Sequence, residues 1–525
     1  RGGVAYRPPG LLRSLGRAIA EVDRGLDGFD HPAIHREFSW DLDAARAALA
    51  RAQWPDDPEG RAFAAHAIAL HAAHVAPVAA SLRRQAIHND ANDYNVLVGG
   101  GAGAAARRQQ VGGLLDFGDL MWSARVHDVA IAAAYALLGQ DDPLAAVAAV
   151  TGGYHETWPL DEREIAAIFA LVLLRLALSV HHAAVQVAVR PADDYLAISQ
   201  APIRRAMPAL MAIHPRLAHY ALRHACGLPP VPHGPAIVAW LVAHGESFAP
   251  VVGRDLAAQA VPVDLSAGSP LVSGDPAGNA PEPIGARIAA AIARASDGAP
   301  DAIGAGGYGE ARVIYTAPAF QGEGPLAESR TVHLGIDLTA PAGTEVRAPF
   351  DGIVHALQDA AGPLDYGPLV VLRHEQAGVP FFTLYGHLDR ASLDRLHGGQ
   401  IVAGGERIGR IGTPRENGGW WPHLHVQVIA DLLDVACNVN GTARPGQREV
   451  WLSVCPDPNL VLRIPARRLP RRRDTASLLV SRRAHVGGNV RLSYREPLRI
   501  ARGWMQYLFD EDGRRYVDAF NNVPH

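Results

Sequence analysis

Four histidines and an aspartate occur at spacings that suit a metal site. His333 and Asp337 are four residues apart, His423 and His425 are two apart, and His387 lies between the two pairs. On an extended chain the side chains alternate between two faces, so each pair lies on one face of its strand. Two imidazoles and a carboxylate on one face form an N/N/O ligand set with room for water, as in a catalytic zinc centre.

A second set of polar residues has the spacing of a phosphoryl-transfer site. Residues 88–95 follow the pattern His-x-Asp-x4-Asn, and Asp116 lies about twenty residues further on. Phosphoryl transfer needs one carboxylate to orient the substrate hydroxyl, and an amide oxygen with a second carboxylate to hold Mg²⁺ on the phosphates. Asp90 suits the first role, and Asn95 with Asp116 suits the second. The alternative is a polar turn, because Asp and Asn are common in turns.

The composition excludes some kinds of chemistry. The chain has 525 residues and a formal net charge of -4, and all 49 of its Lys+Arg residues are arginine. Arginine forms no Schiff base and does not titrate near neutral pH, so a reaction that needs a lysine is not completed within these residues. The nearly neutral charge predicts no general attraction to nucleic acid or to a membrane surface.

The cysteines and the most apolar stretch bear on the compartment. Cys226, Cys437 and Cys455 are widely spaced and odd in number, which fits a reducing, cytoplasmic compartment better than a disulfide framework. Residues 165–180 are strongly apolar but short for a membrane span and contain Arg175, so a buried helix is expected. The chain begins without methionine, and we expect it to be an internal part of a larger protein.

The elements that must position these residues follow from periodicity and composition. Residues 10–85 alternate helical periodicity with short breaks. Residues 263–300 are rich in Pro, Gly, Ser and Ala, which predicts a linker with one helix at 284–295. Residues 303–430 consist of short apolar or alternating stretches that predict strands. Residues 499–518 predict two strands around an acidic Asp-Gly turn.

The phosphoryl-transfer residues between His88 and Asp116 resemble the aminoglycoside phosphotransferase and choline kinase superfamily, and the sequence of residues 87–97 most resembles hydroxylysine kinase-like proteins. This resemblance covers residues 1–230. It implies ATP or GTP as the donor, Mg²⁺ as cofactor and a small amino alcohol or hydroxy-amino acid as the acceptor. It also implies that Asp128 braces the catalytic loop. The superfamily's glycine-rich loop and strand lysine are absent from these residues, so the kinase site is expected to be incomplete.

The residues of the predicted metal site belong to a segment, residues 303–430, that resembles the LytM/lysostaphin-type zinc peptidases. The segments that carry this resemblance occur in the family's order: Gly335-Ile-Asp337, Ala348-Pro, Gly352-x-Val354, Tyr385-Gly-His387-Leu, Gly409-x-x-Gly412 and Pro422-His-Leu-His. The implied substrate is a small peptide or amide.

The peptidase resemblance also implies a role for each residue of the first set. His333, Asp337 and His425 become the Zn²⁺ ligands, while His387 and His423 become catalytic histidines that polarise water and stabilise the tetrahedral intermediate. Zinc lowers the pKa of a bound water toward neutrality, and neighbouring imidazoles can exchange protons near physiological pH.

Other features leave alternatives open. A Trp420-Trp421 pair precedes the His-x-His motif, and residues 359–364 look like an insertion, so the substrate is undetermined. One alternative is a zinc metallopeptidase with non-catalytic flanking domains. Another is a metal-binding module that recognises peptides without cleaving them. His355, His374 and His397 are interpreted as core or surface residues.

The last stretch, residues 480–525, resembles the amino-terminal segment of class III pyridoxal-phosphate aminotransferases. That resemblance implies pyridoxal phosphate and a homodimer only for a longer protein, whose cofactor loop and Schiff-base lysine lie further along the chain. The order of the three parts resembles a known bacterial fusion arrangement, and the aminotransferases in such fusions are similar to phospho-lyases that act on phosphorylated amino alcohols.

The sequence therefore predicts a multidomain enzyme. Its fold is a mainly α kinase-like C-terminal lobe, a mostly antiparallel β zinc-peptidase domain, and a short β hairpin that begins an α/β aminotransferase domain. The predicted boundaries are 1–230 for the kinase-like domain, 231–302 for a linker with a helix, 303–430 for the peptidase domain, 431–479 for a second linker and 480–525 for the aminotransferase start.

Overall fold

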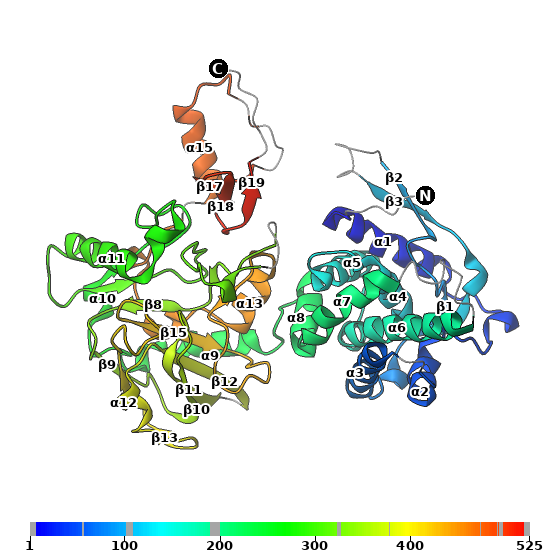
Figure 1. The fold of residues 1–525 in the computed structure, drawn as a ribbon, viewed down its shortest axis with the longest axis horizontal. Helices are drawn as coiled ribbons and strands as arrows, with labels where there is room; N and C mark the ends of the chain where they lie inside the picture. Colours follow the sequence, from blue (N-terminus) through cyan, green and yellow to red (C-terminus); the bar gives the residue numbers. More distant parts are fainter. Residues whose placement is uncertain are drawn as a thin grey trace. The chain divides into compact units, whose positions relative to one another are not determined.

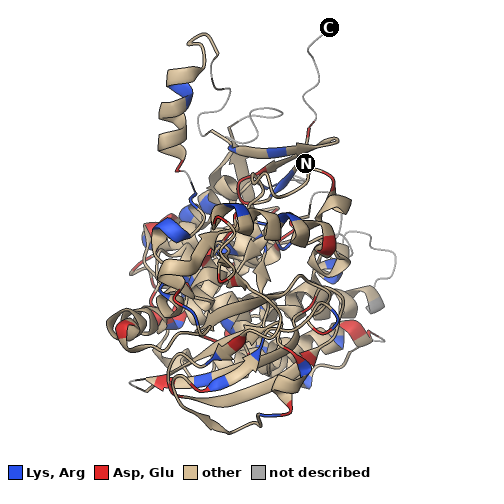
Figure 2. Ribbon diagram, turned by 90° about the vertical axis from the view of Figure 1, so that its left-hand side faces the viewer, with Lys and Arg blue, Asp and Glu red and all other residues tan. Residues whose placement is uncertain are grey.

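A computed structural model describes most of the chain. The described residues are 7–54, 57–100, 109–189, 200–322, 327–376, 378–472, 474–490, 492 and 497–518. They form two compact units, Arg1–Pro230 and Val231–His525, both traced in Figure 1. Basic and acidic residues are interspersed along the ribbon (Figure 2).

Unit 1 is mainly helical. Its helices are α1 (Pro9–Gly25), α2 (Leu42–Arg51), α3 (Pro58–His74), α4 (Val126–Ala136), α5 (Pro143–Thr157), α6 (Glu162–Val189), α7 (Gln200–Ala212) and α8 (Pro215–Ala225). Helices α3 and α5 begin where the sequence provides both an N-cap and a starting proline, since Asp57 and Asp142 accept hydrogen bonds from the first turns.

Helix α6 contains the apolar stretch that the sequence predicts to be a buried helix, and the structure confirms this. The helix is long and apolar enough to cross a membrane, but most of that stretch is buried inside unit 1. Residues Leu171–Leu174 are fully buried in a core shared with α3 and α4. Burial against neighbouring helices explains the apolar composition of this segment.

Two small antiparallel pairs complete unit 1 and border the predicted phosphoryl-transfer loop. Strand β1 (Arg84–Ile87) pairs with β4 (Met121–Ala124), and β2 (Val96–Gly99) pairs with β3 (Gln110–Leu114). The loop with the His-x-Asp-x4-Asn pattern runs from β1 to β2, so both of its ends are anchored in strands.

Unit 2 is built on an eight-stranded sheet in which neighbours are antiparallel except for the pair β5–β6. In spatial order the strands are β13 (Ile401–Val402), β10 (Gly352–Ala360), β11 (Gly367–Gln376), β12 (Val379–Gly386), β15 (His423–Ile429), β8 (Ile336–Thr339), β6 (Ile303–Ala305) and β5 (Ala260–Pro262), and Figure 1 shows the central ones side by side.

Two short pairs flank this sheet. Strand β7 (Val332–His333) pairs with β16 (Thr442–Ala443), and β9 (Glu345–Arg347) pairs with β14 (Arg407–Arg410). All of β15 is buried, and so is most of β11. The antiparallel β architecture predicted for residues 303–430 is therefore present.

The prediction of a linker over residues 231–302 is wrong for most of that segment. It contributes β5 to the main sheet, and helix α9 (Gly234–His244) packs Trp240 against Phe350 and Phe381. The predicted helix is α11 (Pro281–Ala295), whose buried Ile284 and Ile288 join a core cluster. The composition of this segment wrongly predicted a linker, because the apolar residues that pack are separated by Gly, Ser and Pro.

The second predicted linker, residues 431–479, also folds largely onto unit 2. Helix α13 (Arg448–Val454) buries Trp451 and Val454, and the Ala430 N–H donates to the Val454 carbonyl at 2.7 Å. Beyond it lie α15 (Thr475–His485) and a three-stranded antiparallel sheet of β17 (Ile500–Trp504), β18 (Tyr507–Asp510) and β19 (Arg515–Val517).

Candidate metal centre

The register of the central strands brings the predicted metal ligands together. Strand β15 lies antiparallel to β8, and this pairing places His425 directly opposite Asp337. His333 ends β7, and two residues separate it from the start of β8. The three residues that the sequence singled out as ligands therefore converge from three strands.

The donor atoms of these three residues face one another. His333 Nε2 lies 3.0 Å from His425 Nδ1 and 3.3 Å from Asp337 Oδ1, and His425 Nδ1 lies 3.1 Å from that same oxygen. All three donor atoms lie within 4.8 Å of one another, and all three side chains are buried. Two ring nitrogens and a carboxylate oxygen at these separations fit a divalent cation with an N/N/O ligand set.

Gly335 shows that the centre requires a close approach of the backbone. A Cβ atom at this position would lie 2.4 Å from His425 Cε1 and 2.5 Å from its Nε2. Only glycine leaves room for the ring of His425, which explains why a glycine separates the two ligand strands β7 and β8.

His425 is oriented by Gln427, two residues along the same strand. The His425 Nε2–H donates to Gln427 Oε1 at 3.0 Å, which leaves Nδ1 as the free electron pair that faces the other ligands. Gln427 is itself held because its amide donates to the Asn440 carbonyl at 3.2 Å and to Cys455 Sγ at 3.0 Å.

The two histidines predicted to be catalytic lie beside the ligand set. Their rings are 4.2 Å apart. His387 donates from Nδ1 to the Asn417 carbonyl at 3.0 Å, and His423 donates from Nδ1 to the Trp421 carbonyl at 2.7 Å. Each ring therefore keeps Nε2 as the unprotonated nitrogen, free to accept a proton.

Burial keeps these imidazoles neutral. It lowers the pKa of His333 to about 3, with the nearby Arg312 adding to the effect, and it lowers the pKa of His387 well below the usual value. Burial works against ionisation of Asp337, but His333 and Arg312 hold its pKa well below the ordinary range. Neutral imidazoles and an ionised carboxylate are the protonation states that bind a metal.

Arg312 is a functional residue that the sequence reasoning missed. It is 1% exposed, donates through NH1 to Asp337 Oδ2, and donates through Nε to Glu310 Oε2 at 2.7 Å. The arginine thus holds the carboxylate whose other oxygen faces the histidines. In the sequence, Arg312 is recognisable only as an arginine in the stretch before the ligand motif that begins at His333.

A cavity of about 380 Å³ opens onto this centre. All five residues of the predicted site line it, together with Arg312, Arg330, Tyr366 and the two tryptophans. The ring of Trp421 stacks on His423 with the ring centroids 5.0 Å apart, its Nε1–H donates to Thr339 Oγ1 at 3.2 Å, and it also belongs to the core cluster formed with α11. Trp420 and Trp421 therefore pack helix α11 against the domain and also border the cavity.

The other histidines of this domain lie outside the centre. His374 is buried between strands, where Nδ1 donates to the Asp351 carbonyl and Nε2 accepts from Thr383, and His397 is exposed. His355 lies on β10 beside Phe382. These positions match their interpretation as core or surface residues.

In unit 1 the predicted loop is held by Asp128. Its carboxylate accepts hydrogen bonds from the His88 N–H at 2.9 Å and from the Asn89 N–H at 2.7 Å, which is the expected bracing contact. Asn89 has a positive φ of 68°, so the chain turns sharply just before Asp90.

Asp90 lies at the wall of a cavity of about 260 Å³. Its carboxylate accepts hydrogen bonds from Asn92 at 2.9 Å, from Asn95 at 2.8 Å and from Arg175 at 3.3 Å. Burial raises its pKa, and Arg175 opposes that effect. A partly desolvated carboxylate of this kind can accept a proton from a substrate hydroxyl.

The two predicted Mg²⁺ ligands of unit 1 are less closely assembled. The Asn95 amide nitrogen binds Asp90, so its oxygen stays free for a cation. Asp116 is exposed, with a positive φ of 62°, and accepts a hydrogen bond from the Gly118 N–H at 3.2 Å. Neither residue is among those that line the Asp90 cavity.

Comparisons with known proteins agree with both motif sets. Residues 331–437 match the model of peptidase family M23, and residues 1–166 match the model of the phosphotransferase enzyme family. Hydroxylysine kinase of Mus musculus is 29% identical over 194 residues, which cover 36% of this chain and 52% of that protein. The chain thus spans about half the length of the hydroxylysine kinases that it matches.

Two further relatives match the rest of the chain. DD-carboxypeptidase/endopeptidase Mpg of Neisseria meningitidis serogroup B is 36% identical over 125 residues, which cover 23% of this chain and 26% of that protein. An alanine–glyoxylate aminotransferase 2-like protein of Drosophila melanogaster is 53% identical over 45 residues, which cover 8% of this chain and 9% of that protein. The chain therefore joins a segment that matches the phosphotransferase enzyme family to a segment that matches peptidase family M23, followed by a short stretch similar to an alanine–glyoxylate aminotransferase 2-like protein.

Proposed function

We propose that unit 2 is a zinc-dependent hydrolase of a peptide or amide bond. The observation that carries this proposal is the convergence of His333, Asp337 and His425 next to two further imidazoles in one cavity. His333 Nε2, Asp337 Oδ1 and His425 Nδ1 would hold the metal. Zinc bound there would supply a Lewis acid for the substrate carbonyl and would lower the pKa of a water molecule.

The remaining chemistry belongs to the two neighbouring histidines. His387 and His423 each keep Nε2 unprotonated toward the cavity because Nδ1 donates to a backbone carbonyl. Either ring can take a proton from the attacking water at Nε2, and the imidazolium so formed can then stabilise charge on the substrate oxygen or return that proton to the leaving amine.

The test of this hydrolase uses the full-length protein. Zinc content is measured by elemental analysis, and cleavage of glycine-rich peptides and cell-wall-type peptides is followed by mass spectrometry. We expect one zinc per chain and hydrolysis that stops on chelation. The His425→Ala variant should lose the metal, whereas His397→Ala, which changes an exposed histidine, should keep it.

Two outcomes distinguish the alternatives. Zinc content that persists in His425→Ala would contradict the ligand assignment. Tight binding of peptides without any cleavage, with zinc present, would favour the non-catalytic recognition module.

We also propose that unit 1 takes part in phosphorylation of a small amino alcohol or hydroxy-amino acid, with ATP or GTP as donor and Mg²⁺ as cofactor. The support is Asp90, a partly buried carboxylate that lines a cavity and follows a braced loop. In this proposal Asp90 orients the acceptor hydroxyl, and Asn95 with Asp116 holds the cation. Hydroxylysine kinases are the relatives that favour an amino-acid acceptor.

This second activity is tested by incubating the full-length protein with ATP or GTP and either ethanolamine or hydroxylysine. Formation of a phosphate ester is measured by mass spectrometry. General-base residues contribute roughly 10²- to 10⁴-fold, so Asp90→Asn should lower turnover by that factor while Asp141→Asn, an exposed site, should not. No nucleotide turnover with either acceptor would reject the kinase proposal.

The last part of the proposal concerns the stretch similar to the aminotransferase-like protein. In a longer protein it would begin a domain that uses pyridoxal phosphate for transamination or for elimination of phosphate, and that dimerises. We place these reactions in the cytoplasm, in keeping with three free cysteines. Binding of pyridoxal phosphate by the full-length protein, measured by absorbance, tests this part.

A further inference from the structure

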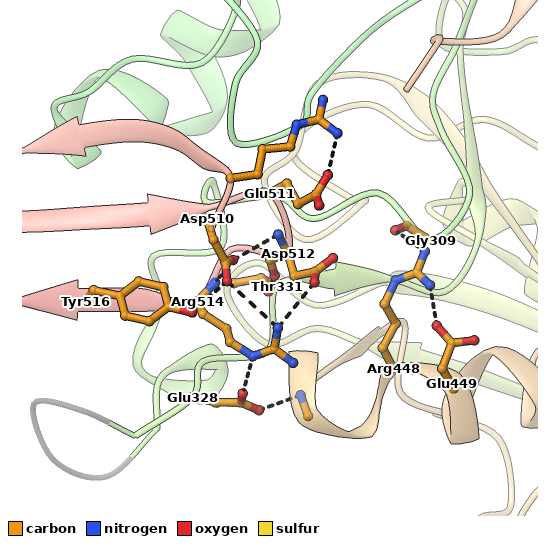
Figure 3. Close-up of polar contacts among 12 residues, drawn as sticks. Gly309, Glu328, Thr331, Arg448, Glu449, Asp510, Glu511, Asp512, Arg514 and Tyr516 are labelled. Carbon is orange, nitrogen blue, oxygen red and sulfur yellow. Dashed lines mark hydrogen bonds and ion pairs between the residues drawn. The ribbon is translucent and has the colours of Figure 1, made fainter. Parts of the chain in front are cut away.

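The C-terminal sheet of strands β17 to β19 belongs to unit 2, and two of its contacts with the rest of that unit lead toward the candidate metal centre. The first contact is the turn between β18 and β19. Thr331 Oγ1 donates to the Asp512 carbonyl at 3.0 Å, and Arg514 Nε donates to Glu328 Oε1 at 2.9 Å, as Figure 3 shows. Thr331 lies two residues before the ligand His333.

Hydrogen bonds within the turn between β18 and β19 define its conformation independently of Thr331. Asp510 is buried and accepts hydrogen bonds from the Asp512 N–H at 2.9 Å, from the Arg514 N–H at 2.8 Å and from the Tyr516 hydroxyl at 2.9 Å. Gly513 has a φ of +76°, and a Cβ atom there would lie 2.8 Å from Thr331 Cβ. The turn therefore fits against Thr331 closely and with a defined conformation.

The second contact is made by Arg502 on β17. Its Nε donates to the Ala267 carbonyl and its NH2 donates to the Ser269 carbonyl, both at 2.7 Å. The Ala267 N–H in turn donates to the Ala311 carbonyl at 2.9 Å, next to the arginine that holds Asp337.

The two contacts meet at Arg312. Its backbone N–H donates to the Thr331 carbonyl at 2.8 Å, and its side chain joins Glu310 to the ligand Asp337. Glu310 also accepts a hydrogen bond from the Leu265 N–H at 3.0 Å, close to the loop that Arg502 binds. The C-terminal sheet thus fixes the segments that lead to both His333 and Asp337.

We propose that residues 500–517 form a docked positioning element of the metal centre, so that docking of this sheet and binding of zinc are coupled. The stretch that resembles an aminotransferase would therefore help to order the metal site of the proposed hydrolase in the same chain. Coupling follows because a docked sheet already orders the segments that lead to the ligands, so metal binding costs less conformational entropy. By thermodynamic linkage, bound zinc then favours docking of the sheet to the same extent. The inference rests on metal binding in the proposed function and not on peptide cleavage.

The test measures zinc affinity of the full chain by competition with a chelator. Thr331→Val removes the hydroxyl with little change of shape, and Thr331→Ser restores it. We expect Thr331→Val, and separately the double variant Arg502→Ala/Arg514→Ala, to weaken zinc binding by about fivefold or more, the low end of coupling between sites. Thr331→Ser should bind as the unaltered protein does. Arg483→Ala is the matched control, because Arg483 is exposed on α15 and has no partner among the described residues.

A second measurement separates positioning from a merely structural contact. Amide hydrogen exchange over residues 507–517 should slow when zinc is added to the unaltered chain, and this protection should shrink in Thr331→Val. Unchanged zinc affinity in both variants, while these amides exchange faster, would overturn the inference. Absence of zinc binding by the unaltered chain would instead refute the proposed hydrolase.

Discussion

Both units of the protein pair a carboxylate of a candidate site with a buried arginine, but the two pairs differ in their surroundings. In unit 2, Arg312 binds Asp337, and their side chains are 1% and 7% exposed. In unit 1, Arg175 binds Asp90, and their side chains are 2% and 21% exposed. Each carboxylate lines a cavity, but Asp337 faces three histidines, whereas Asp90 accepts hydrogen bonds from two asparagines.

The pKa values of the two carboxylates move in opposite directions. Asp337 is held well below its ordinary range because His333 and Arg312 outweigh its burial. The pKa of Asp90 is raised because burial outweighs Arg175. The same pair of residue types thus gives an anion suited to hold a metal in one unit and a more basic carboxylate in the other.

The strongest test of this contrast is Arg312→Met. The change leaves Glu310 and Asp337 buried without their cation, so we expect a loss of about 3–5 kcal/mol in the free energy of unfolding of unit 2. Urea denaturation followed by tryptophan fluorescence measures it. Zinc should recover part of the loss, because the metal neutralises Asp337. A loss below about 1 kcal/mol would contradict the importance of this pair.

His374, in the same sheet, shows how burial changes the pKa of a group without an ion pair. Burial lowers its pKa to about 4, against an ordinary value of 6.5. The unfolded chain therefore binds a proton at a higher pH than the folded one, and folding stability should fall by about 3 kcal/mol between pH 6.5 and pH 4. Denaturation at a series of pH values measures this slope, which His374→Gln should flatten.

Gln427→Met probes the orientation of a metal ligand. The variant removes the acceptor for the His425 Nε2–H, so the ring can turn or change its tautomer. Loss of such a partner typically lowers metal affinity about 10- to 100-fold. Chelator competition measures the affinity, and Gln358→Met, at an exposed position on β10, is the control. Equal affinity in the two variants would exclude a role for Gln427.

The smallest effect is expected for Arg175→Met, the counterpart of Arg312→Met. Asp90 keeps Asn92 and Asn95 and stays partly hydrated, so we expect a loss of roughly 1–2 kcal/mol in stability. Arg175 lowers the pKa of Asp90, so its removal should raise that pKa and move the acid limit of the proposed phosphotransfer to higher pH. The pH profile of turnover measures this, and an unchanged profile would contradict the assigned pairing.

Much of the local structure could be predicted from the sequence. Helix α11, the buried helix α6 and strands β11 and β12 occur where periodicity places them. The linkers could not be predicted, because Val263 and Leu265, both nearly fully buried, lie among residues typical of loops. Local composition cannot show which apolar residues have a packing partner far along the chain.

The sequence by itself identified the residues of the candidate metal centre by type and motif, and the spacing of His423 and His425 places both on one face of β15. His333 and Asp337 lie on separate strands, β7 and β8, so their spacing alone did not bring them together. Tertiary structure decided the rest. The pairing of β15 with β8 puts His425 opposite Asp337, although 88 residues separate them. Arg312 and the C-terminal sheet reach the centre through contacts that no local pattern encodes, because they depend on the register and packing of distant segments.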